Sequence, residues 1–224
     1  YDNWTPGYDR DSSLPKTQVL GKDTNGDGVL DAMKSEDWSR FTPRVGIEYQ
    51  ADDNTMYFAS FSQGFKSGTF NPRAGANEDA ADPEIVDSFE IGMKKDWTDA
   101  LRTNITLFST EHQDRQYIVV VPQENDTDLG QFLANAASSD VKGIEAEVTW
   151  LATENLTLNL AYGHLSADIK QDETIKVPLV GLSNTPDDTF SLSANYLLES
   201  SVGVFMINAG YYYRSDYTIF EDDD

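Results

Sequence analysis

The chain has 224 residues, of which 39% are hydrophobic and 25% are charged, and it contains no cysteine. The lack of cysteine excludes a disulfide framework and a thiolate nucleophile or metal ligand. Sixteen Lys and Arg residues oppose 39 Asp and Glu residues, which gives a formal net charge of −23. Such an acidic chain lacks the basic surface that binding to nucleic acid needs, and its field attracts cations, including Ca²⁺.

The sequence begins at Tyr1 without an initiator Met or a signal peptide, so we expect it to be a segment of a longer chain. Its longest clean apolar run, Tyr117 to Val121, ends at Pro122 and is far shorter than the ~18 residues that a membrane helix needs. Hydropathy alone therefore indicates a soluble protein. Transmembrane β-strands escape that test, because apolar and polar residues alternate along them.

Residues 1–40 contain an acidic turn, residues 23–31, with the sequence DTNGDGVLD. Its oxygen-bearing residues occupy positions 1, 3, 5 and 9 of an EF-hand-type Ca²⁺ loop, with glycine at position 6. The predicted ligands are the side chains of Asp23, Asn25, Asp27 and Asp31 and the carbonyl of Val29. Position 12 is Lys34 instead of the usual Glu, so Glu36 or Asp37 would complete the site. The alternative is an acidic turn without an ion.

From residue 41 onward, apolar and polar residues alternate with a period of two, which predicts strands with one apolar and one polar face. The pattern predicts four hairpins, at 41–50/55–63, 85–97/100–112, 140–151/156–167 and 186–197/201–214. Short polar turns join the two strands of each hairpin, whereas long segments near 64–84, 113–139 and 168–185 join successive hairpins. This sorting of connection lengths is typical of outer-membrane β-barrels.

The two faces of the predicted strands also differ as the faces of a barrel wall do. An aromatic residue precedes each short turn, in phase with the apolar face: Tyr49, Trp97, Trp150 and Tyr196. These would form one ring at a membrane interface, although chance and the β-propensity of aromatics are an alternative. Charged and amide residues occupy the opposite faces: Glu48, Glu90, Lys94, Asn104, Glu145, Glu147 and Asn159. A wet or plugged lumen would keep them hydrated, as would the solvent face of a soluble sandwich.

No segment carries the residue pattern of a catalytic site. The two histidines, His112 and His164, have no serine partner in a nucleophile motif. Glu145 and Glu147 share one strand face, but nothing in their surroundings marks one of them as a general acid. We therefore expect that the protein is not an enzyme.

Four short motifs follow one another along the predicted hairpins. Residues 62–71 read SQGFKSGTFN, and Pro83-Glu84 precedes FEIGMK at residues 89–94. Asn135-Ala136 precedes KGIEAE at residues 142–147, and Pro186 opens a strand. In this order the motifs resemble the barrel of TonB-dependent outer-membrane receptors, and the resemblance covers about residues 38–214.

The resemblance implies an all-β fold, an antiparallel up-and-down transmembrane β-barrel segment with about eight strands of a larger barrel of about 22. Residues 1–40 would then be an extracellular loop with the Ca²⁺-binding turn, where the ion orders the loop. Residues 41–224 would be a partial barrel of four hairpins with long extracellular loops. The plug domain and the TonB box of the family are absent from this sequence.

The family also implies a function and partners. Such receptors lie in the outer membrane of Gram-negative bacteria, in contact with its lipid, and take up a scarce nutrient such as a ferric siderophore. The small nutrient ligand binds at the extracellular loops, and the TonB complex drives uptake through the missing N-terminal region. The candidate ligand contacts are Phe65, Phe70, Asn71 and Arg73. The alternatives are a passive porin-type channel and a secreted Ca²⁺-binding β-sandwich adhesin.

Overall fold

The structure, a computed structural model, describes residues 4–6, 20–22, 32–34, 36–71, 80–122, 129–171 and 181–219. Three short strands, β1 (Trp4–Pro6), β2 (Leu20–Lys22) and β3 (Ala32–Lys34), form a small sheet. The large sheet contains β4 (Arg44–Asp52), β5 (Thr55–Lys66), β6 (Glu84–Thr98), β7 (Leu101–Pro122), β8 (Leu129–Thr153), β9 (Leu156–Gln171), β10 (Asp188–Ser200) and β11 (Gly203–Arg214). Within these ranges, no helix has the length and hydrophobicity to cross a membrane.

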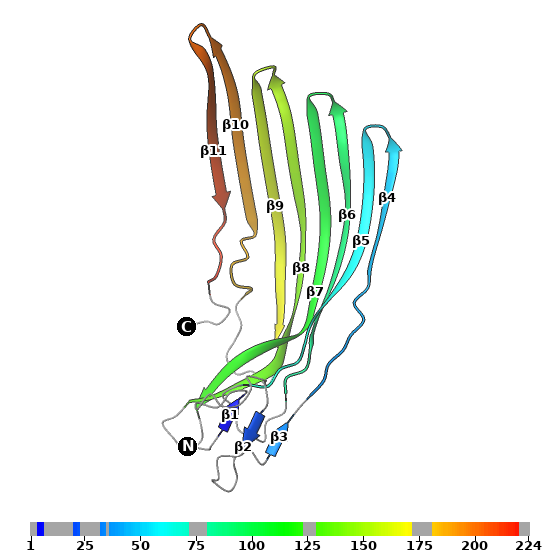
Figure 1. The fold of residues 1–224 in the computed structure, drawn as a ribbon, viewed down its shortest axis with the longest axis vertical. Coiled ribbons are helices and arrows are strands. Elements are labelled where there is room, and N and C mark those ends of the chain that lie inside the picture. Colours follow the sequence, from blue (N-terminus) through cyan, green and yellow to red (C-terminus); the bar gives the residue numbers. More distant parts are fainter. Residues whose placement is uncertain are drawn as a thin grey trace.

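Each strand of the large sheet pairs antiparallel with its neighbour in sequence, in the order β11-β10-β9-β8-β7-β6-β5-β4. Figure 1 shows the result as one long curved layer, with the four short turns at one end and the longer connections at the other. We call these the turn end and the loop end. The all-β, up-and-down prediction and the four predicted hairpins are confirmed.

Residues that face each other across an antiparallel pair lie on the same side of the sheet, so the ladder register defines two continuous faces. One face carries apolar side chains across all eight strands, and we call it the apolar face. Its rows include Ile47, Ala59, Ile91, Leu107 and Ile144, and Tyr49, Tyr57, Met93, Ile105, Ala146, Tyr162, Phe190 and Tyr213. The alternation read from the sequence therefore corresponds to a single sheet-wide surface.

The apolar face packs against no second layer in the described part of the chain. Leu107 is 50% exposed although it lies in the middle of an apolar row, and Ile47, on the edge strand β4, is 68% exposed. Ala81 and Ala137 are the only buried hydrophobic residues among those described. A β-sandwich buries such a face between two sheets, so this single layer does not fit the sandwich alternative.

The opposite side of the sheet is the polar face, and it carries the charged residues that the sequence places away from lipid. One row contains Gln50, Met56, Lys94, Asn104, Glu147, Ala161, Ser191 and Tyr212. Within it, Asn104 Nδ2 donates a 3.1 Å hydrogen bond to Glu147 Oε2. Cross-strand polar pairs of this kind stabilise the wall without a dry core.

Two glycines on the polar face lie beneath phenylalanine rings of the preceding strand. A Cβ at Gly92 would come within 2.5 Å of both Phe58 Cε1 and the Ile105 carbonyl oxygen. The same arrangement recurs two strands further along, where a Cβ at Gly143 would lie 2.6 Å from Phe108 Cζ. Both glycines belong to the motifs quoted above, and the space that they leave is filled by an aromatic ring.

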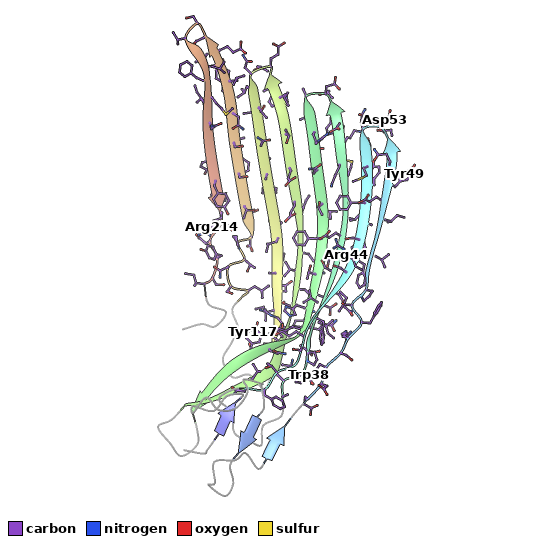
Figure 2. All side chains as sticks on the ribbon, viewed as in Figure 1. Trp38, Arg44, Tyr49, Asp53, Tyr117 and Arg214 are labelled. Atoms are coloured by element: carbon purple, nitrogen blue, oxygen red, sulfur yellow. The ribbon has the colours of Figure 1, made fainter. Side chains whose placement is uncertain are left out.

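The four aromatics before the short turns lie on the apolar face, near the turn end. Their exposed fractions run from 64% for Tyr49 to 39% for Tyr196, and Figure 2 shows Tyr49 close to the tip of its hairpin. Trp97 Nε1 donates to Thr103 Oγ1 at 2.9 Å, and Lys95 Nζ lies 4.7 Å from the centre of the Trp97 ring. A polar contact at the edge of an apolar surface suits a residue at a membrane interface.

The expectation of a long loop over residues 113–139 is wrong, because most of this segment is strand. Residues 116–122 of β7 pair with residues 129–135 of β8, and neither stretch pairs with β6 or β9 in the described part of the chain. We call this two-stranded extension the ribbon, and Figure 1 shows it bending across the loop end. The bend coincides with register shifts around Arg115 and with Asp114 at a φ of 54°.

Candidate functional site at the loop end of the sheet

A polar cluster lies where β5, β6 and β7 reach the loop end, and the carboxylate of Glu84 is at its centre. Lys66 Nζ donates to Glu84 Oε1 at 2.5 Å, and the backbone N–H of Gln116 donates to the same oxygen at 2.9 Å. His112 Nε2 lies 2.7 Å from Glu84 Oε2. The Glu84 side chain is 8% exposed, so this carboxylate is shielded from water by its partners.

A second set of hydrogen bonds extends the cluster to the flanking loops. The Gln116 amide donates to the carbonyls of Ser67 at 3.0 Å and Asp82 at 2.8 Å. Asn135 Nδ2 donates to the carbonyls of Asp82 and Asp114, and Asn135 Oδ1 accepts from the backbone N–H of Asp82. We call Lys66, Glu84, His112, Gln116 and Asn135 the anchor cluster, because they join the loop after β5 to the base of the ribbon.

Glu84 lies at the loop end, outside the apolar rows of the sheet, and its surroundings shift the pKa of its carboxyl. Burial would raise the pKa, but hydrogen bonds from Lys66 and from the two β7 donors outweigh it and hold the pKa below its ordinary 4.5. The carboxylate is therefore charged at neutral pH. A buried charge with three donors is a fixed structural element, since losing one partner leaves the charge uncompensated.

The loop that follows β5 is itself folded back at its base. Thr69 and Ala81 exchange two backbone hydrogen bonds, at 3.2 and 2.9 Å. The ring of Phe70 lies 6.4 Å from that of Trp38, in a tilted arrangement. Together with the anchor cluster, these contacts fix where the loop leaves the wall and where it returns.

The predicted ligand contacts fall in different environments. Phe65 is half-buried on the apolar face, in the row of Ile85, so it points away from the polar face. Phe70 is half-buried against Trp38, and Asn71 is 5% exposed. Arg73 lies outside the described residues, as does the predicted Ca²⁺ turn at residues 23–31.

In the sequence, Glu84 and Asn135 stand out only as parts of the family-like motifs, and His112 has no serine partner in a nucleophile motif. The structure brings them together, and the available signal was that each motif starts where a strand meets a long connection. The other histidine, His164, has its Nδ1 3.0 Å from Asp188 Oδ1, an oxygen that also accepts from the Tyr162 hydroxyl at 2.8 Å. Neither histidine lies beside a nucleophile in the contacts that the structure describes.

Comparisons with known proteins place this geometry in a family. Residues 7–224 match the family model described as TonB dependent receptor-like, beta-barrel. The chain is 30% identical over 134 residues to the metal-pseudopaline receptor CntO of Pseudomonas aeruginosa, covering 60% of this chain and 18% of that protein. It is 23% identical over 188 residues to the ferric-pyoverdine M114 receptor PbuA of Pseudomonas sp. strain M114, covering 83% and 22%. The chain thus spans about a fifth of each of these relatives.

Solved structures share the fold. The ferric yersiniabactin uptake receptor FyuA from Yersinia pestis superposes with a TM-score of 0.59 at 18% identity, over 74% of this chain and 24% of that one. BauA, the ferric preacinetobactin receptor from Acinetobacter baumannii, also gives 0.59, at 17% identity over 78% and 25%. The family match extends over nearly the whole chain, and its members lie in the outer membrane of Gram-negative bacteria. The chain belongs to the β-barrel family of TonB-dependent receptors.

Proposed function

We propose that the protein containing this chain is a receptor for TonB-dependent uptake of a chelated metal ion, such as a ferric siderophore. The observation that carries the proposal is the one-layer wall, whose apolar face is exposed for lipid while its polar face carries charges suited to a wet lumen. The similar proteins named as metal-pseudopaline and ferric-pyoverdine receptors support this class of ligand. No chemical step is assigned to the chain itself.

In this proposal, the loop end of the sheet faces the medium and the loops around the anchor cluster receive the ligand. Phe70, Asn71 and Arg73 belong to the loop after β5, and Phe65 lies at the end of that strand. Ca²⁺ bound by Asp23–Asp31 would order another extracellular segment. Energy for release would come from the TonB complex, which acts on parts of the protein outside this chain.

The test is uptake of radiolabelled iron by cells that express the full-length protein as their sole receptor. The panel consists of ferric pyoverdine, ferric yersiniabactin and ferric preacinetobactin, with metal-loaded pseudopaline measured by its metal. We expect saturable uptake of one member that stops when TonB is deleted. Uptake that rises linearly with concentration and persists without TonB would instead indicate the passive porin-type channel.

A further inference from the structure

Glu84 is the only buried carboxylate among the described residues, and it lies at the last rung of the β5–β6 ladder, opposite Lys66. Burying a carboxylate costs several kcal/mol unless hydrogen bonds compensate for it. Pairing of β5 with β6 does not require a buried carboxylate, because other pairs on the same face carry exposed polar residues. The position of this buried charge therefore calls for an explanation other than the stability of the wall.

Two donors to Glu84, Lys66 and His112, lie on strands that pair with β6, whereas the third, Gln116, lies beyond the end of the β6–β7 ladder. Lys66 is the last residue of β5, directly before the loop whose base is closed by Thr69 and Ala81. Gln116 is the first residue of the ribbon and also binds the carbonyls on both sides of that loop. One carboxylate thus links the start of the loop, its return and the bend of the ribbon.

We propose that Glu84 is a positioning residue for ligand capture, which fixes the base of the loop, at residues 67–71 and 80–83, and the base of the ribbon, at Gln116, relative to each other. The proposal rests on the proposed function and deepens it. A loop held in its binding position lowers the ordering cost that a ligand would otherwise meet on binding. Loss of the carboxylate would release both segments while leaving the ladders below Glu84 paired.

The first experiment needs no ligand. Hydrogen exchange is measured on the full-length protein in detergent, for the wild type and for Glu84→Gln, which retains the size of the side chain and removes its charge. We expect exchange of the Thr69, Ala81 and Gln116 amides to accelerate by about tenfold or more. The Asp96 amide, which donates to Asn54 at the turn end, should keep its rate.

The second experiment separates positioning from general stability. Uptake of the transported member of the panel is measured over a range of concentrations for the same variant. We expect the half-saturating concentration to rise by about tenfold, with an unchanged maximal rate, because ligand in excess can still select the ordered loops. A simple folding defect would lower the maximal rate through loss of receptor, without a change in half-saturation.

Glu90→Gln is the matched control. Glu90 lies on the polar face of the same strand and accepts only a 3.4 Å hydrogen bond from Ser60 Oγ among the hydrogen bonds described. It should alter neither the loop amides nor the half-saturating concentration. Unchanged loop exchange in Glu84→Gln, or acceleration that includes Asp96, would overturn the proposal, as would loosened loops with unchanged half-saturation. If the wild type takes up no member of the panel, the proposed function fails, while exchange still decides whether Glu84 holds the loops.

Discussion

Replacing Gly92 with alanine adds one methyl group to the polar face, at a point where the structure leaves no room for it. The new Cβ would lie 2.5 Å from Phe58 Cε1 and 2.5 Å from the carbonyl oxygen of Ile105. The Phe58 ring can swing away, with loss of its contact with Lys94, whose Nζ lies 5.7 Å from the ring centre. The Ile105 carbonyl belongs to the backbone of β7 and can move only if the ladder shifts.

We expect Gly92→Ala to lower the free energy of unfolding by roughly 1–3 kcal/mol, the usual cost of overpacking. The companion change Phe58→Ala should recover only part of this loss, because it removes the ring and leaves the carbonyl. Gly46→Ala is the control on the same face, since the nearest atom to its Cβ would be the carbonyl oxygen of Ala59, at 3.8 Å.

The assay is urea unfolding of the full-length protein in lipid vesicles, followed by the loss of the fast-migrating folded band on unheated gels. Gly92→Ala should unfold at a lower urea concentration than the wild type, and Gly46→Ala should match the wild type. Equal midpoints for Gly92→Ala and Gly46→Ala would refute the argument that the glycine is required by the ring and carbonyl beside it.

Three further predictions test other parts of the molecule. Leu107→Lys on the apolar face should destabilise the folded protein in vesicles by about 2–4 kcal/mol, whereas Thr106→Lys, on the polar face, should unfold near the wild-type urea concentration. Because the pKa of Glu84 is lowered in the fold, its stabilisation should be complete above pH 4.5 and disappear as the pH falls through the lowered value. Acid titration of loop exchange should show this loss in the wild type and not in Glu84→Gln. Calorimetric titration should detect Ca²⁺ binding that Asp27→Ala abolishes, and equal heats for both proteins would argue for a turn without an ion.

The strands and turns of the large sheet could be predicted from the sequence because the residue patterns that specify them are local. Alternation sets the faces and short polar turns set the hairpin ends, so the predicted bounds of β6 differ from the observed ones by a single residue at each end. The ribbon could not be predicted in the same way. The Tyr117–Val121 run is apolar on both sides and lacks alternation, and the residues between it and its partner on β8 contain no Asn-Gly or Asp-Gly pair that would mark a tight hairpin.

The anchor cluster could not be predicted from the sequence either, but for a different reason. Glu84, His112 and Asn135 are far apart in the chain, and only the ladder register brings them to one place. A histidine or an asparagine at the end of a strand gives no sign of which segment it will contact. The bulge at Asp114 also changes which residues of β7 face Glu84, and a bulge shifts register without a reliable sequence signal.

The one-layer architecture also limits how far damage can spread. In a packed core, a misplaced side chain presses on many others, and strain passes through the interior. Here each side chain meets mainly its neighbours along the strand and across one rung. The ring-over-glycine pair on β5 and β6 and the one on β7 and β8 are therefore separate local units, each of which joins one hairpin to the next, and a substitution in one pair leaves the contacts of the other in place.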